Sequence, residues 1–148
     1  TSHIYQLRIQ SNDAIILAGN FTSFNGTSAN RVLRLHSDGS LDTAFSTNIG
    51  SGPGSQAFRL AIQSDGKILV TYSSTTWAGT TVGALVRLNS NGTRDTSFST
   101  EIGTALEGNQ VQSMTPDGNK MLVMGSFQSW KGSPVGRIVR LNSDGTLD

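Results

Sequence analysis

The chain of 148 residues carries a net charge of +1, and charged residues make up only 14% of it. This balance excludes a strongly basic nucleic-acid-binding protein and an acidic disordered chain. The sequence has no cysteine, which excludes disulfides and thiolate metal ligands, and its longest apolar clusters are far shorter than the ~20 residues that cross a bilayer. We therefore expect one repeat domain over residues 1–148, with no membrane span and no nucleic-acid partner.

One motif occurs three times at a constant spacing. Its copies are LHSDGSLD, LNSNGTRD and LNSDGTLD, at residues 35–42, 88–95 and 141–148. Each copy begins 53 residues after the previous one, a period typical of a repeated supersecondary unit. The repeats are assigned to residues 3–55, 56–108 and 109–148.

Each repeat begins with two predicted strands joined by a tight turn. The matching segments are, in chain order, LRIQSNDAIILAGNF, LAIQSDGKILVTYSS and QSMTPDGNKMLVMGSF. In the second repeat, FRLAIQ (58–63) alternates as a half-buried strand does, and SDG (64–66) is an Asp-Gly turn. The following KILVTY (67–72) is apolar and β-branched enough for a buried strand.

The second half of each repeat predicts two more strands. After a loop around Trp77, ALVRLN (84–89) is the third strand, SNG (90–92) the next tight turn, and TRDTSF (93–98) a short fourth strand. No repeat contains a stretch of about 11 residues with helical periodicity. The chain is therefore predicted to be all-β, with four strands in each repeat.

The size of the repeat is that of one β-propeller blade. We therefore predict three four-stranded antiparallel blades; a β-trefoil, which also has three repeats and closes on itself, is the alternative. A propeller needs about four to eight blades. The three repeats are thus expected to belong to a larger ring, completed by further repeats of the same polypeptide or by sister chains of a homo-oligomer.

The repeated motifs also resemble those of a known family. IQSDGKILV at 62–70 and the LNSDGTLD motif are similar to the delta-60 repeat, a β-propeller repeat of bacterial and phage proteins, over nearly the whole chain. The second copy departs from the pattern at Ser74, Ala84 and Arg94. The resemblance implies a propeller with no assigned chemistry, in a secreted, cell-surface or virion protein.

The recurring turn could serve as a calcium site. Its oxygen ligands would come from Asn89, Asn91 and Asp95, or from the equivalent Asn142, Asp144 and Asp148. The glycine stands fourth in this loop, however, whereas an EF-hand loop has it sixth. Asn-Gly and Asp-Gly are also the residues that tight hairpin turns prefer. We therefore expect a turn, with no metal and no cofactor.

Two further sets of residues recur at the same repeat positions. One consists of the arginines Arg34, Arg87 and Arg140, together with the aspartates Asp42, Asp95 and Asp148. The arginines could form a ring that binds anions, but each has its own acidic partner, which favours ion pairs at a seam between repeats. The other set is aromatic and consists of Phe24, Trp77 and Trp130. These rings could stack on sugars or fill the space between blades.

Catalytic residues are not indicated. Of the ten acidic residues, only Glu101 and Glu107 lie outside the repeated turn positions, and His3 and His36 suggest no Ser-His-Asp arrangement. We expect a non-catalytic scaffold or interaction module that binds protein partners. The alternatives are a carbohydrate-binding module that uses the loop aromatics on surface glycans, and a glycan-cleaving propeller whose catalytic acids lie elsewhere.

Overall fold

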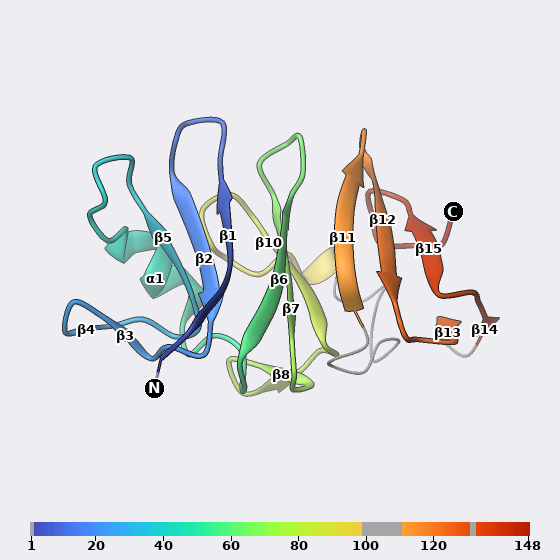
Figure 1. Cartoon of the computed structure of the whole chain (residues 1–148), viewed down its shortest axis with the longest axis horizontal. Coiled ribbons are helices and arrows are strands. Elements are labelled where there is room, and N and C mark those ends of the chain that lie inside the picture. Colours follow the sequence, from blue (N-terminus) through green and yellow to red (C-terminus); the bar gives the residue numbers. More distant parts are fainter. Residues whose placement is uncertain (1, 99–110, 131–132) are drawn as a thin grey trace.

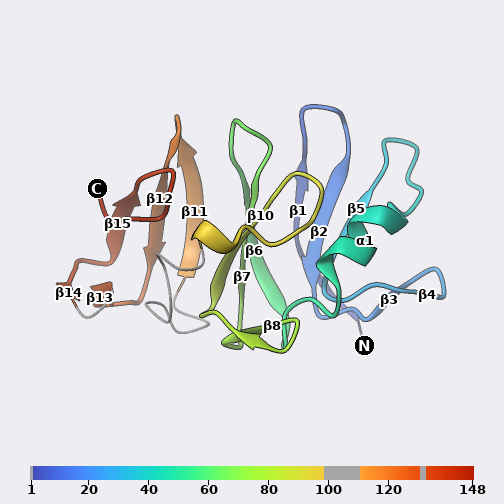
Figure 2. The ribbon, with the colours of Figure 1, turned by 180° about the vertical axis from the view of Figure 1, so that it is seen from behind.

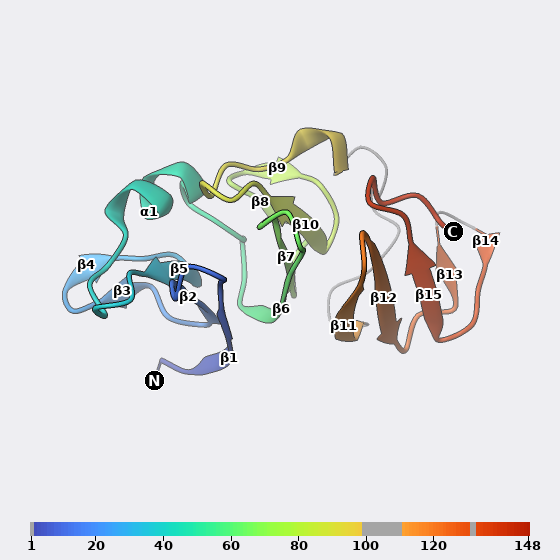
Figure 3. The same cartoon turned by 90° about the horizontal axis from the view of Figure 1, so that it is seen from above.

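The computed structural model describes residues 2–98, 111–130 and 133–148. Each repeat forms one three-stranded antiparallel sheet, numbered sheet 1 to sheet 3 in chain order, and one two-stranded hairpin. Seen from above, the sheets lie side by side in an arc (Figure 3). The first strands of the sheets, β1 (Ile4–Ile9), β6 (Ala57–Ile62) and β11 (Val111–Asp117), line the inner side of the arc. Strand β6 contacts both β1 and β11. This arrangement confirms the predicted propeller blades.

Each sheet is built around a central strand that pairs with both neighbours (Figure 1). The central strands are β2 (Ile15–Gly19), β7 (Ile68–Tyr72) and β12 (Lys120–Gly125). The outer strands are β5 (Val32–Leu35), β10 (Leu85–Leu88) and β15 (Ile138–Leu141). In the described residues, every strand pairs only with strands of its own repeat, and the three sheets are open and do not close into a barrel. The β-trefoil alternative is therefore wrong.

A short hairpin separates the second and third strands of every sheet. These hairpins are β3 (Ser23–Phe24) with β4 (Thr27–Ser28), β8 (Thr76–Trp77) with β9 (Thr80–Thr81), and β13 (Ser129–Trp130) with β14 (Ser133–Pro134). They occupy the Gly-, Ser- and Thr-rich segments that the sequence analysis treated as loops.

The predicted fourth strand at 93–98 is wrong. A single bridge pairs Leu88 with Arg94, after which residues 96–98 are helical. In the first repeat the same position holds helix α1 (Thr43–Ile49), which lies beside β5 (Figure 2). The physical reason is an N-cap: the Asp42 carboxylate accepts a hydrogen bond from the Phe45 amide at 2.9 Å.

Asp-Gly and Asn-Gly turns stand where they were predicted. Asp65 accepts from the Lys67 amide at 3.1 Å, and Asn91 accepts from the Thr93 amide at 3.0 Å. The glycines Gly66 and Gly92 have φ angles of 81° and 92°, which residues with a side chain rarely adopt. The turns therefore reverse the chain without strain.

Apolar cores fill the spaces between adjacent sheets. Successive side chains of a strand point to opposite faces, so a central sheet contributes to two cores. Sheet 2 packs Leu60 and Val70 against sheet 1, in the core that also holds Ile16. On its opposite face, Leu69 packs in the core that also holds Val123 of sheet 3.

In the described part of the chain, no helix is long and apolar enough to cross a membrane.

Gly92 allows a turn of the second repeat to dock on the first repeat. A Cβ atom at this position would lie 2.8 Å from Cδ2 of Phe45 and 2.9 Å from its carbonyl oxygen, whereas one at Gly39 would meet nothing within 4 Å. Both glycines have positive φ. Gly39 and Gly92 therefore both need a left-handed backbone conformation, and they differ only in that Gly92 contacts Phe45.

We predict that Gly92→Ala destabilises the chain more than Gly39→Ala does. Both substitutions should lower the free energy of unfolding by about 1–2 kcal/mol, because alanine is strained in the left-handed backbone conformation. Gly92→Ala should lower it by about 1–3 kcal/mol more, because the methyl group overpacks the contact with Phe45. Urea unfolding of both variants checks this. Equal losses would show that the turn does not press on the preceding repeat.

Candidate functional site

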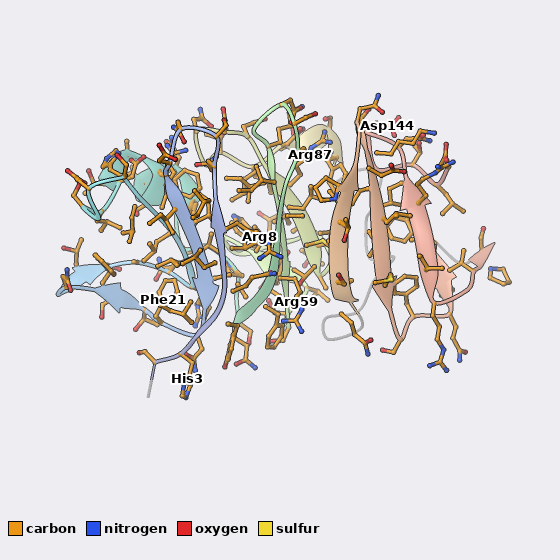
Figure 4. The ribbon with its side chains drawn as sticks, turned by 45° about the horizontal axis from the view of Figure 1, so that its top comes forward. His3, Arg8, Phe21, Arg59, Arg87 and Asp144 are labelled. Carbon is orange, nitrogen blue, oxygen red and sulfur yellow. The ribbon has the colours of Figure 1, made fainter. Side chains whose placement is uncertain are left out.

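The guanidinium of Arg87, on β10, is a polar group that links two of the sheets. Its Nη2 and Nε lie 2.8 and 3.1 Å from Oδ2 of Asp95, and its Cζ lies 4.3 Å from the centre of the Phe98 ring. Nη1 donates to the backbone carbonyl of Ser143, in the third repeat. Figure 4 labels Arg87 and Asp144, the residue next to that carbonyl. One side chain thus joins two repeats.

Arg34 makes the same contacts one repeat earlier. Its Nη2 lies 2.7 Å from Oδ2 of Asp42, and its Cζ lies 4.4 Å from the centre of the Phe45 ring. Nη1 donates to the Ser90 carbonyl of the second repeat at 2.6 Å, 56 residues further along the chain. We call this arrangement the arginine latch: an arginine, the aspartate of its own repeat, the aromatic ring three residues after that aspartate, and a serine carbonyl of the following repeat.

Arg140 makes only the part of the latch that lies within its own repeat. Its Nε lies 2.5 Å from Oδ2 of Asp148, and its Nη1 lies 3.6 Å from Asp117. Its side chain is 50% exposed, against 5% for Arg87. The structure therefore places all three arginines beside the expected aspartates, and two of them also reach across a seam.

The aspartates of the two complete latches are held in the ionised form. Burial by itself raises the pKa of Asp95, but hydrogen bonds from Ser97 and Arg87 and the Arg87 charge outweigh it and bring the pKa to about 2. Burial likewise opposes the net lowering of the pKa of Asp42, which comes from the Phe45 amide and Arg34. The latches therefore contain full charges at neutral pH.

Most of the side chains considered for calcium already make hydrogen bonds or ion pairs within the repeat. Asn91 accepts from both the amide and the hydroxyl of Thr93, Asn89 donates to that hydroxyl at 3.0 Å, and Asp95 faces Arg87. In the third repeat, Asp144 accepts from the amide and hydroxyl of Thr146. Among the residues described, no three His, Asp or Glu side chains gather in a way that suits a metal ion.

The aromatic residues at the repeated loop position are mainly packing groups. Trp77 and Trp130 are each 2% exposed and belong to the two cores between the sheets. The Trp77 ring meets Tyr72 edge-on at 5.5 Å. Phe24 is only partly buried, against the outer face of sheet 1. The buried tryptophans cannot offer a ring face to a sugar in this conformation.

Sequence reasoning missed the acceptors of the latch and the contacts of the inner strands. Arg59 Nε donates to the Gln112 carbonyl at 2.7 Å, and the Gln6 side chain accepts from the Leu60 amide. Figure 4 shows Arg59 on the inner side of sheet 2. Backbone groups occur at every position and leave no sequence signal. Glu101 and Glu107, the acids outside the repeat pattern, lie outside the described residues.

Comparison with known families gives one result. The family described as "Domain of unknown function (DUF5122) beta-propeller" matches the chain three times, over residues 10–45, 63–98 and 115–148. These segments fall in the three predicted repeats and cover most of the chain. The match confirms the predicted resemblance to a delta-60-like propeller repeat. No curated protein and no solved structure gives a significant match.

We predict that Arg87→Ala lowers the free energy of unfolding by about 3–5 kcal/mol, because the mostly buried Asp95 carboxylate loses its guanidinium partner and is left with the more distant Lys67 ammonium, 3.7 Å away. The matched variant Arg140→Ala removes the exposed copy of the same side chain and should cost about 1 kcal/mol or less. Chemical unfolding of the two variants measures the difference. Losses of similar size would mean that the contact with the third repeat contributes nothing.

Proposed function

The chain belongs to the β-propeller family described as a domain of unknown function, DUF5122, and we propose that it acts as a rigid, non-catalytic scaffold. Its task in this proposal is to hold protein partners or further repeats of the same polypeptide at fixed positions. The observation that supports the proposal is the repeated arginine latch. The most recurrent charged residues of the chain bind one repeat to the next at both seams.

The packing of the seams supports rigidity. Each seam combines an apolar core with a latch and with a contact between inner strands. Sliding or tilting one sheet on another would separate the arginine from its carbonyl acceptor while the charge remained buried, which is costly. A scaffold that has to keep a fixed geometry benefits from this restriction.

The family resemblance suggests where such a scaffold works. Delta-60-like repeats point to a secreted, cell-surface or virion protein, and we place the chain in that setting as part of the proposal. In this proposal, the propeller segment keeps neighbouring parts of a larger protein at fixed positions.

A second candidate function is carbohydrate binding, which one observation favours. Phe24, the least buried of the three loop aromatics, lines a cavity of about 180 Å³ together with Phe21, Ser23 and His3. An aromatic face beside polar side chains suits stacking and hydrogen bonding to a sugar.

A glycan array separates the two functions. If the chain is a scaffold only, we expect no glycan to be retained by the unsubstituted protein. Binding that is lost in Phe24→Ala and kept in Phe58→Ala, a control aromatic on the inner strand β6, would establish the carbohydrate function instead.

The rigid scaffold itself is tested with the two tryptophans as reporters. Trp77 lies in the core between sheets 1 and 2, and Trp130 lies in the core between sheets 2 and 3. Trp130→Phe and Trp77→Phe each leave one reporter. Because a rigid scaffold unfolds as one unit, the fluorescence transition of each variant should coincide with its own circular dichroism transition in urea. Separate transitions would show repeats that unfold independently and would contradict the proposal.

A further inference from the structure

A polar cavity of about 430 Å³ lies between the first and second repeats. Two turns form its walls: residues 10–12 follow β1, and residues 63–66 follow β6. These turns stand at the same end of neighbouring sheets (Figure 1). Arg34 and Ser90, the donor and the acceptor of the first latch, also line the cavity. The seam between two successive repeats therefore forms this cavity, which we call the seam cavity.

Two glutamines at equivalent repeat positions line the seam cavity, one on each wall. The Gln10 Oε1 lies 3.5 Å from Nη1 of Arg34, and the Gln63 Oε1 lies 3.4 Å from Nη1 of Arg87. The opposite orientation of either amide would place its NH2 group against a guanidinium, donor against donor. Both arginines therefore orient the amides so that their NH2 groups remain as hydrogen-bond donors.

The donor of Gln63 is buried and has no partner. Gln63 is only 7% exposed, and its Nε2 makes no hydrogen bond to any described residue. A buried polar group costs free energy unless a protein group, a water or a ligand satisfies it. The Gln63 amide therefore has room for an acceptor atom placed in the seam cavity.

The charges around the seam cavity also suit an acceptor. Of the described residues that line it, Arg34 is the only charged one, and none is acidic. Asp42 pairs with Arg34 but does not line the cavity. The hydroxyls of Ser11 and Ser64 add further groups that can donate. The walls therefore offer donors and a guanidinium, and no carboxylate that would repel an anion.

The next seam differs at the same position. Asp117 closes the β11–β12 hairpin by pairing with Lys120, as Gln63 closes the β6–β7 hairpin. Its Oδ2 lies 3.6 Å from Nη1 of Arg140, so it makes the contact with the arginine of its own repeat that Gln63 makes in the second repeat. An acid and an amide both serve this contact, so the pair of amide donors in the first seam is not required by the repeat itself.

From these observations we propose that the seam cavity binds a small oxyanion, whose oxygens accept hydrogen bonds from the amides of Gln10 and Gln63. A carboxylate, a phosphate and a sulfate share the necessary chemistry, which is a compact set of negatively charged acceptor oxygens. A ligand held by both walls joins the first two repeats and stabilises the folded chain. The inference goes beyond the proposed scaffold, which requires no ligand.

Two glutamate variants test the proposed donors. Gln63→Glu and Gln10→Glu keep an oxygen for the neighbouring arginine but replace the NH2 donor by a negative charge, which should leave the fold intact. The control is Gln112→Glu, which makes the same change of charge at an exposed position of β11, outside the seam cavity. Circular dichroism verifies that each variant is folded.

Binding is measured by NMR titration, with the backbone amides of Ser11, Ser64 and Ser90 as reporters. The probes are sodium phosphate, sodium sulfate and sodium acetate, each at an ionic strength held constant with sodium chloride, and glucose as a neutral polyol. We expect at least one anion to shift the three reporters with saturation. Its affinity should fall about tenfold or more in Gln63→Glu and Gln10→Glu, because a donor is lost and a like charge is gained. Gln112→Glu should bind as the unsubstituted chain does.

Other outcomes overturn the inference. Shifts that never saturate, or that are the same in the two glutamate variants as in the unsubstituted chain, would show only weak surface contacts of the ions. Shifts of the three reporters by glucose and by no anion would identify a site for a neutral polyol. If Gln63→Glu does not fold, Gln10→Glu decides alone. The tryptophan reporters of the rigid scaffold are read without any ligand, so the two proposals fail separately.

Discussion

The guanidinium of Arg87 is the group on which the arrangement of the sheets depends. It is buried, it carries a full charge, and it reaches an aspartate of its own repeat and a backbone carbonyl of the next one. A buried charge that loses a partner is expensive, and a planar guanidinium fixes the direction of its donors. The placement of the third sheet beside the second is therefore tied to this side chain. The seam between the first two repeats has the same parts: Arg34 lies over the Phe45 ring of α1, whose cap is Asp42, and the Gly92 turn contacts Phe45.

The seam also links the fold to the proposed function. Residues that recur in a repeat family are often read as ligand sites, yet here the recurring arginines and aspartates hold repeats together and the recurring tryptophans fill cores. Under the proposal, a module of this kind acts through the geometry it imposes on neighbouring repeats, which is the property expected of a scaffold.

The period of the repeat allowed most of the fold to be predicted. Alternation identified the first strands, and Asp-Gly and Asn-Gly identified the turns, because these signals are local. The prediction of a fourth strand was wrong for a physical reason. TRDTSF is β-branched enough for a strand, but its Asp95 accepts from the Ser97 amide as Asp42 caps α1 in the first repeat. Helix α1 is also too short to show helical periodicity in the sequence. The Arg–Asp pairs could be anticipated from their shared spacing. The Ser90 and Ser143 carbonyls could not, since backbone acceptors have no signature in a sequence.

Coupling between repeats through the latch is tested most directly by amide hydrogen exchange in the Arg87→Ala variant. The amides of Asn142 and Gly145 close the turn that carries the Ser143 carbonyl. If Arg87 holds this turn, their protection should fall although the substitution lies in another repeat, while the equivalent amides of His36 and Gly39 in the first repeat should keep theirs. Faster exchange confined to the second repeat, with the Asn142 and Gly145 amides unchanged, would contradict the account.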